Sequence, residues 1–334
     1  MTPLTVAIVG AGKLGQTHAR HWGAMPGVAV SAVIDTHADA ARALAQTACA
    51  GGALCAFTDL PSLLASAMPD VVDICSPTPS HKHLIEQAAQ AGRAVFVEKP
   101  LARTLADCDA IVNTVAQAGI ALMPGHVVRW FPAFARAKAL VEAGAVGKPV
   151  AVRTARLAGF PRRGGGGAWY ADPEQSGGVV LDALLHDFDW LRWCFGPVTR
   201  VLAKGLTFLP EHAGARDYAL VTLRFGSGAM AHVTGSWAHA GPMRTTFEVC
   251  GDAGMLAFDS DTCLTLTGSA GPQSVRDSPL LPEDDPYYCE LAAFAQAVRA
   301  GGAMPVTAQD GREAVRVALA ALESMKTGQA VRLA

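Results

Sequence analysis

The chain has 334 residues, of which 51% are hydrophobic and 17% are charged, which suits two folded domains and excludes disorder as the working state. Lysine and arginine number 27 against 29 aspartates and glutamates. The charge balance gives no strong field that attracts nucleic acid or an anionic membrane surface, so neither is expected as a partner.

The first third of the chain alternates short Val- and Ile-rich runs with Ala-rich stretches, as repeated βαβ units around a parallel sheet do. Five strands are predicted here: Thr5–Val9, Val28–Asp35, Val71–Ser76, Ala94–Glu98 and Ile120–Pro124. A helix that begins near Thr104 is expected to end at Gly119, because glycine is favoured directly after a helix. Residues 1–124 are therefore predicted to form a doubly wound domain of the α/β class.

A glycine turn follows the first predicted strand and opens a helix; its residues are Gly10, Ala11, Gly12, Lys13, Leu14 and Gly15. In this G-x-G-x-x-G pattern the first glycine makes a tight turn, the second lets the backbone approach a pyrophosphate, and the third lets helix and strand pack closely. Asp35 follows Gly15 by 20 residues, where a carboxylate accepts hydrogen bonds from an adenosine ribose and repels a 2′-phosphate. We therefore expect a Rossmann domain that binds NAD, with NADP left open by Thr36 and His37.

Beyond Pro124 the pattern changes to longer alternating strands, predicted at Val150–Leu157, Val198–Leu206, Ala219–Phe225, Met230–Trp237, Thr245–Cys250 and Met255–Asp259. Glycine-containing turns join several of them, which favours one large, mostly antiparallel open sheet with helices on one face. A closing helix is expected at about Ala308–Lys326. Residues 125–334 are therefore predicted to form an α+β domain.

Three residues carry the predicted chemistry. Lys99 follows a strand of the parallel sheet, at the edge where such sheets bind ligands, and its ammonium group could hydrogen-bond a reacting oxygen. Asp182 and His186 are four residues apart, so on one helix they share a face, and the carboxylate can orient the imidazole and favour its charged form. His186 is therefore the candidate general base, with Asp182 as its partner or as an acceptor for a substrate hydroxyl.

A metal site is the alternative for this stretch, since Asp182, His186, Asp187 and Asp189 are all potential ligands. On a helical wheel, however, Asp187 points away from the other three. The remaining residues would still need ligands from elsewhere in the chain, so no metal is expected.

Three motifs lie far apart along the chain: Asp73–His81 with its Ser76-Pro77-Thr78 segment, the triplet Glu98-Lys99-Pro100, and the glycine pair Gly177-Gly178 followed by Asp182, His186 and Asp189. Together they resemble the Gfo/Idh/MocA family of NAD(P)-dependent oxidoreductases, and the resemblance covers nearly the whole chain. Two departures stand out. Ser76-Pro77-Thr78 replaces the family's usual T-P-N, and Leu184 stands where the family commonly has a glycine.

The resemblance implies hydride transfer between a nicotinamide and a secondary alcohol or ketone of a sugar, inositol or related polyol, with catalysis by Lys99, Asp182 and His186. It implies further cofactor contacts from Ser76, Pro77, His81, Glu98 and Lys99. It also implies that the second domain binds substrate and pairs subunits, giving a homodimer or homotetramer through its sheet.

The glycine-rich run Gly164–Gly167 is predicted to belong to a mobile loop over the substrate cleft. Polar and aromatic side chains could line a pocket for a polyhydroxylated ligand. The candidates are Arg129, Arg156, Arg162, Trp169, Tyr170, Trp237 and His239.

Other functions stay open beside the dehydrogenase. One is a glycosidase that retains NAD for transient oxidation, and another is a non-catalytic NAD(P)-sensing regulator. Outside the family, a dinucleotide fold whose second domain only mediates association is a further alternative. The chain opens directly into an apolar strand without a basic leader, and its cysteines are scattered singly, so we expect a cytoplasmic protein with reduced thiols.

Overall fold

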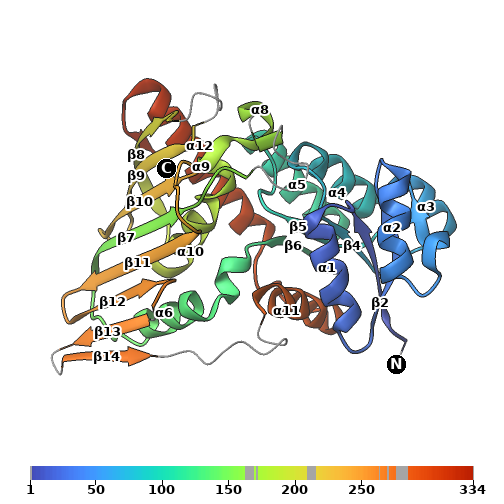
Figure 1. Cartoon of the computed structure of the whole chain (residues 1–334), viewed down its shortest axis with the longest axis horizontal. Coiled ribbons are helices and arrows are strands. Elements are labelled where there is room, and N and C mark those ends of the chain that lie inside the picture. The colour runs from blue at the N-terminus through green and yellow to red at the C-terminus, as the bar shows by residue number, and fades with distance from the viewer. Residues whose placement is uncertain are drawn as a thin grey trace. The chain divides into compact units, whose positions relative to one another are not determined.

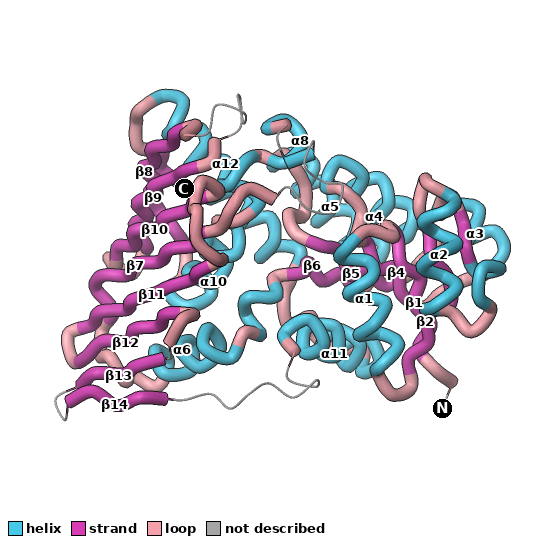
Figure 2. Tube along the Cα trace, viewed as in Figure 1, coloured by secondary structure: helices cyan, strands magenta, loops and turns pink. Residues whose placement is uncertain are grey.

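The computed structural model describes residues 2–161, 169–170, 172–208, 216–262, 264–268, 271–275 and 285–333, with only the backbone at 53–54, 264–268 and 271–275. Internal contacts divide the chain into two compact units. Unit 1 comprises Met1–Val127 and Leu281–Arg312, and unit 2 comprises Val128–Leu280 and Glu313–Ala334. Figure 1 labels the elements of both units, and Figure 2 separates their helices and strands by colour.

A parallel sheet forms the centre of unit 1, with six strands in the described residues and the order β3-β2-β1-β4-β5-β6. This order confirms the predicted Rossmann domain, whose ligand crevice lies where the strand order reverses, beside β1 and β4. The sequence did not predict the two-residue strand β3. The bounds are β1 (Leu4–Val9), β2 (Val28–Ile34), β3 (Ala56–Phe57), β4 (Val71–Ile74), β5 (Ala94–Glu98) and β6 (Leu122–Gly125).

Helices cover the sheet of unit 1, and α5 begins and ends where the sequence predicts. Thr104 Oγ1 accepts the Asp107 N–H at 3.0 Å and caps the first turn of α5, and Gly119 ends that helix with φ +63°. The bounds are α1 (Lys13–Ala24), α2 (Ala38–Ala48), η1 (Gly52–Cys55), α3 (Leu60–Ser66), η2 (Thr78–Ser80), α4 (His81–Gln90), α5 (Leu105–Ala118) and α11 (Pro286–Ala300).

The division between the units differs from the expected split into 1–124 and 125–334. The first boundary lies at Val127, but residues 281–312, including α11, return to unit 1. There the Phe294 ring meets Phe96 edge-on at 5.5 Å, and Arg299 Nη2 donates to the Gly27 carbonyl at 2.6 Å. An apolar helix face is visible in the sequence, but the sheet that it covers is decided only by the fold.

A mixed open sheet forms unit 2, with nine strands in the described residues and the order β14-β13-β12-β11-β7-β10-β9-β8-β15. Only the β7–β10 pair among these is parallel, so the prediction of a mostly antiparallel sheet is confirmed. The bounds are β7 (Pro149–Leu157), β8 (Val198–Leu206), β9 (Tyr218–Phe225), β10 (Met230–Ser236), β11 (Arg244–Gly251), β12 (Gly254–Asp259), β13 (Leu264–Gly268), β14 (Gly271–Val275) and β15 (Val331–Arg332).

Helices pack on one face of the unit 2 sheet. In β8, Val201 and Ala203 are buried whereas Leu202 and Lys204 between them are exposed, as expected for a sheet covered on one side. The bounds are η3 (Val127–Trp130), α6 (Pro132–Glu142), α8 (Pro173–Ser176), α9 (Gly178–Asp182), α10 (Leu185–Phe195) and α12 (Ala308–Thr327). Across the described residues of both units, no helix combines the length and apolar character that crossing a membrane requires.

Candidate functional site

The glycine turn between β1 and α1 has the geometry that its sequence pattern predicts. Gly10 has φ +105°, and a methyl group there would lie 2.9 Å from the Cys75 backbone, while one at Gly15 would lie 1.8 Å from the Gly10 carbonyl oxygen. At Gly12, by contrast, no atom of the described residues lies within 4 Å of such a methyl group. The outer glycines therefore permit close packing, and the middle one leaves the backbone open to an approaching phosphate.

Asp35 lies directly beside this turn. Its Oδ2 accepts the Ala11 N–H at 2.8 Å, and its Oδ1 accepts the His37 N–H at 2.8 Å. The carboxylate is partly exposed, with 18% of the side-chain surface accessible. Lys13 and Leu14 form the start of α1, next to the same turn. The structure thus brings the predicted ribose acceptor and the predicted pyrophosphate turn together.

His81 joins two loops at the carboxyl edge of the unit 1 sheet. Its Nε2 lies 2.9 Å from the Ser76 carbonyl oxygen and its Nδ1 lies 3.0 Å from the Pro100 carbonyl oxygen, with the ring 1% exposed. Burial lowers the pKa of His81, which favours the neutral ring. The Ser76 hydroxyl pairs with that of Ser80 at 2.7 Å, and Ser80 donates to the Pro77 carbonyl at 2.8 Å. The side chain of His81 therefore braces the segment that carries Ser76 and Pro77.

Lys99 leaves β5 at the same edge. It is half-buried, follows the buried Glu98, and precedes Pro100 through a cis peptide bond. The Glu98 carboxylate folds back, so that its Oε2 accepts the Lys99 backbone N–H at 3.1 Å. The predicted lysine thus stands where parallel sheets bind ligands.

Asp182 and His186 belong to consecutive helices of unit 2 rather than to one helix. Asp182 ends α9 and His186 lies in the first turn of α10, and both are half-buried. The backbone N–H groups of Ala183 and Leu184 both bond to the Val179 carbonyl, at 3.0 and 2.9 Å, which closes α9. The assumption of one continuous helix, on which the shared face of the pair was predicted, is therefore wrong.

The two neighbouring aspartates form buried ion pairs with arginines. Asp187 Oδ2 lies 2.7 Å from Arg156 Nε, and Asp189 holds Arg129 through two contacts of 2.7 and 2.6 Å. The Arg129 guanidinium also lies 5.4 Å from the centre of the Trp193 ring. Arginine therefore occupies two of the four carboxylate and imidazole groups that the metal alternative would use, and Arg129 and Arg156 brace α10.

Aromatic side chains that were candidates for the substrate pocket lie together in unit 2. The rings of Trp169 and Tyr170 are 4.7 Å apart, and Trp237 lies 5.8 Å from Tyr170. Phe160, which the sequence did not single out, joins this cluster at 5.5 Å from Trp237. Arg162 and the glycine run predicted to form a mobile loop lie outside the described residues.

Leu184, the departure from the family's glycine, faces the sheet. Its side chain is fully buried, and a methyl group on Gly235 of β10 would lie 2.7 Å from Leu184 Cγ. The missing side chain at Gly235 thus makes room for Leu184.

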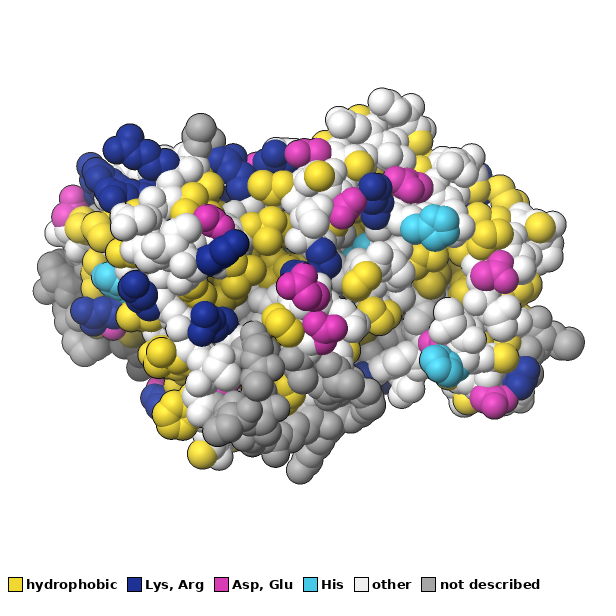
Figure 3. Space-filling model, turned by 90° about the horizontal axis from the view of Figure 1, so that it is seen from above, with side chains coloured by type: hydrophobic (Ala, Val, Ile, Leu, Met, Phe, Trp, Pro, Cys, Tyr) yellow, Lys and Arg dark blue, Asp and Glu magenta, His cyan; other side chains and the backbone are white. Residues whose placement is uncertain are grey.

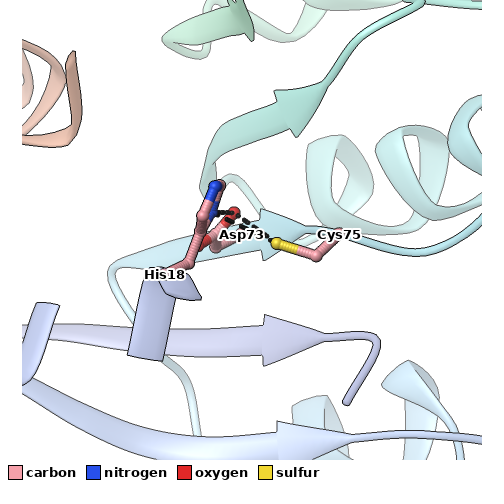
Figure 4. Close-up of side chains that lie close together, drawn as sticks. All are labelled: His18, Asp73 and Cys75. Carbon is pink, nitrogen blue, oxygen red and sulfur yellow. Dashed lines mark hydrogen bonds and ion pairs between the residues drawn. The ribbon is translucent and has the colours of Figure 1, made fainter. Parts of the chain in front are cut away.

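A buried polar network in unit 1 escaped the sequence analysis (Figure 4). His18 Nδ1 lies 2.9 Å from Asp73 Oδ2 and 3.2 Å from Cys75 Sγ, and its Nε2 lies 3.2 Å from Glu98 Oε1. Asp73 also accepts the Trp22 indole N–H at 2.7 Å. These residues come from α1, β4 and β5, so no local spacing could have revealed them.

The strand order, the glycine turn beside Asp35 and the polar strand ends define a dinucleotide-binding oxidoreductase. Residues 4–126 match the oxidoreductase family with an NAD-binding Rossmann fold, and residues 134–257 match the Gfo/Idh/MocA C-terminal domain. The chain belongs to the Gfo/Idh/MocA family. This confirms the predicted family, the oxidoreductase class and NAD as the cofactor.

Relatives match over almost the entire chain. A myo-inositol 2-dehydrogenase from Thermotoga maritima is 31% identical, over 99% of this chain and 98% of that protein. A D-apiose dehydrogenase from Paraburkholderia graminis is 29% identical, over 98% of this chain and 89% of that protein. The crystal structure of an oxidoreductase from Agrobacterium radiobacter with NAD+, L-tartaric acid and magnesium has a TM-score of 0.90 at 25% identity, covering 99% of this chain and 98% of that one.

Proposed function

We propose that the protein oxidises a secondary alcohol of a sugar, inositol or related polyol, or reduces the corresponding ketone. One observation carries the proposal: Lys99 stands at the carboxyl edge of the same sheet whose glycine turn and Asp35 fit a dinucleotide. The substrate class is supported by the relatives, which include an inositol dehydrogenase and an apiose dehydrogenase.

Residues of unit 1 fit NAD. The open backbone at Gly12 would hold the pyrophosphate, and the Asp35 carboxylate would accept the ribose hydroxyls. Ser76 and Pro77 lie on a loop that His81 holds in place, and Glu98 is the last residue of β5. A bound NAD+ would supply the hydride acceptor, and the overall reaction would convert the secondary alcohol and NAD+ into the ketone, NADH and a proton.

The chain supplies the groups that handle the hydroxyl proton. The Lys99 ammonium group hydrogen-bonds the reacting oxygen and stabilises the negative charge that develops on it. His186 accepts the hydroxyl proton at an imidazole nitrogen, and Asp182 favours the charged ring or binds a substrate hydroxyl. These roles are the ones that the family resemblance implies.

The aromatic cluster in unit 2 is the proposed substrate-contacting surface. Trp169, Tyr170 and Trp237 meet edge to face, and such rings pack against the C–H faces of sugars while their polar atoms bond hydroxyls. Arg156 adds a cation beside Asp187, at 2.7 Å. Together these groups suit a polyhydroxylated ligand.

The test is the absorbance of reduced nicotinamide while the purified protein is offered NAD, then NADP, with sugars, inositols and sugar acids at alkaline pH. Reduction of NAD by one of these compounds is the expected result. If NAD binds tightly, no compound is oxidised and an aryl glycoside is hydrolysed, the retained-cofactor glycosidase replaces this proposal.

Lys99→Ala and His186→Ala separate an enzyme from a sensor. Both variants should still bind NAD and lose at least about a hundredfold in kcat, because each removes a proton-handling group. A wild-type protein that binds NAD but turns over none of the panel, with variants that behave identically, would point to the regulator.

We also infer that the protein associates into a homodimer or homotetramer through the outer face of the unit 2 sheet, and that it works in the cytoplasm. The association is supported by apolar side chains on that face, including Leu202 and Leu220.

The cytoplasmic location is supported by the cysteines, since each one that the structure describes is a free thiol. Light scattering and cell fractionation test the two statements.

A further inference from the structure

A histidine between two carboxylates is enclosed in the core of unit 1. His18 is fully buried, with Asp73 on one side of its ring at 2.9 Å and Glu98 on the other at 3.2 Å. Burial alone lowers the pKa of His18, but Asp73 and the hydrogen bonds outweigh it and raise the pKa well above its usual value. The two carboxylates on either side of the ring therefore favour its charged form.

Metal binding does not account for this group, although ligand atoms of His18, Asp73 and Cys75 lie within 4.8 Å of one another (Figure 4). A metal needs a thiolate and a neutral imidazole. Burial and the charge of Asp73 raise the pKa of the Cys75 thiol, and the pKa of His18 is raised as well, so protons compete with a metal at both groups. The three groups instead bond to each other at hydrogen-bond distances, from 2.9 to 3.5 Å.

Glu98 links this network to Lys99. One carboxylate oxygen, Oε1, faces His18 at 3.2 Å, and the other, Oε2, accepts the Lys99 backbone N–H at 3.1 Å. The paired strand β6 has Gly125 opposite Glu98, and a methyl group there would lie 3.2 Å from Oε1. The carboxylate is thus confined on three sides, and its position fixes the backbone from which the Lys99 side chain projects.

We propose that His18 is a positioning residue for Lys99: it fixes the carboxylate of Glu98 that holds the Lys99 backbone, and it balances the negative charge that Glu98 places next to residue 99. The idea rests on the catalytic role proposed for Lys99. Asp73 in turn holds His18 in its charged state, assisted by Trp22, which bonds the same carboxylate.

Other ionisable groups also face this network. His21 lies on the same helix as His18. Tyr287 is in α11, and Asp285 directly precedes that helix. The charge of Glu98 also acts on the pKa of His81 on α4. Burial raises the pKa of Tyr287, and the charges of Glu98 and Glu290 raise it further. The groups that a variant at position 18 can perturb are therefore Asp73, Cys75, Glu98, His21, His81, Asp285, Tyr287 and Glu290.

The first measurement is the amine pKa of Lys99, obtained by competitive labelling with acetic anhydride across pH and mass spectrometry. In His18→Gln the Glu98 charge is no longer balanced, so the Lys99 pKa should rise by about one unit. In His18→Gln/Glu98→Gln it should return toward the wild-type value. Lys82, which pairs with Asp107 at 2.9 Å, is the internal reference and should not change.

The second measurement is kcat beside the NAD dissociation constant. His18→Gln should lower kcat by at least about tenfold with NAD affinity within about twofold of wild type, since the glycine turn and Asp35 are untouched. His83→Gln, an exposed histidine of α4, is the matched control and should leave both values unchanged. If His18→Gln does not fold, Asp73→Asn, which weakens the charged state of His18, should give the same direction.

A Lys99 labelling curve that is the same in wild type, His18→Gln and Asp73→Asn would overturn the proposal, as would a loss of kcat that merely parallels a loss of NAD binding. Failure of the proposed catalytic role is a separate result. In that case Lys99→Ala would retain activity while the labelling shift in His18→Gln persisted.

Discussion

At the residue scale, Asp35 is the carboxylate proposed to select the cofactor. Asp35 Oδ2 is held by the Ala11 N–H at 2.8 Å and Oδ1 by the His37 N–H at 2.8 Å, so it cannot turn away from the glycine turn. A fixed negative charge at this point favours a ribose diol and opposes a 2′-phosphate. We therefore propose that the preference for NAD over NADP depends on the Asp35 side chain and its two backbone donors.

Asp35→Asn is expected to lower the ratio of kcat/KM for NAD to that for NADP by at least about tenfold, because a charged hydrogen bond becomes neutral and the repulsion disappears. The asparagine oxygen still accepts the Ala11 N–H, so the turn should remain intact. Steady-state kinetics with both cofactors check this, and Asp39→Asn on the exposed surface of α2 is the control. An unchanged ratio would remove Asp35 from the cofactor site.

His18 is expected to make stability depend on pH. Its pKa in the folded protein is raised above the unfolded value, so its contribution is fully present below about pH 6.5 and is lost as the pH rises through the folded pKa. The difference in free energy of unfolding between wild type and His18→Gln should therefore shrink as the pH rises from about 6.5 through the pKa of His18 in the folded protein. Urea titrations from mildly acidic to alkaline pH measure it. A difference that grows with pH would contradict a charged His18.

The predictability of the site follows how its residues are spaced along the chain. The glycine turn, Asp35 and Lys99 could be found because strand ends and local spacing place them. The triad of His18, Asp73 and Glu98 could not, because its members come from three elements and meet only after the sheet has formed. Sequence spacing finds groups that one turn positions, and misses groups that tertiary packing brings together.

At the scale of elements, the bulky Leu184 fits against the sheet because the strand beneath it has a glycine at position 235. Leu184, in the turn between α9 and α10, lies over Gly235 of β10 and is fully buried. Sequence analysis placed Leu184 on a helix that carries catalytic residues, but it could not show which strand faces it. The pairing means that the fit of these two helices on the sheet depends on both positions.

Gly235→Ala is expected to destabilise the protein by about 1–3 kcal/mol through overpacking, and Leu184→Ala by about 2–5 kcal/mol through the cavity that it leaves. The double variant should cost less than the sum of the two, because the added methyl group enters the space that Leu184 vacates. Thermal and urea unfolding measure all three proteins. Gly226→Ala, in the exposed β9–β10 turn, is the control and should be nearly neutral; additive costs would disprove the contact.

The elements themselves were mostly predictable because strand alternation and caps are local. The strands Ala94–Glu98 and Val198–Leu206 have the predicted bounds, and Thr104 caps α5 as expected. The break between α9 and α10 was missed, since no proline marks it: the two N–H groups that end α9 share one carbonyl. The packing of α11 in unit 1 was not predicted, because an amphipathic pattern shows that a helix has an apolar face but not which sheet that face covers.

At the scale of the molecule, the outer face of the unit 2 sheet carries exposed apolar side chains. Leu202, Leu220 and Met230 alternate with buried neighbours on adjacent strands and are 43%, 45% and 44% exposed. The strand partners of Leu220 and Met230 are the exposed Lys204 and Arg224. Figure 3, seen from above, shows Lys and Arg side chains close to hydrophobic ones at the left of the view. Apolar side chains ringed by charge are typical of a surface that a second protein covers, and a second copy of the chain is the proposed occupant.

Leu220→Glu should weaken this assembly, raising its dissociation constant by at least about tenfold, because an apolar contact becomes a carboxylate that must lose its hydration even where Lys204, opposite it on β8, pairs with it. Light scattering coupled to gel filtration measures the mass, and circular dichroism checks that the variant is folded. Met68→Glu makes the same kind of change at an exposed methionine of unit 1 and should leave the mass unchanged. Association that survives Leu220→Glu and Leu202→Glu alike would mean that the subunits pair through another surface, and the apolar face would then need a different partner.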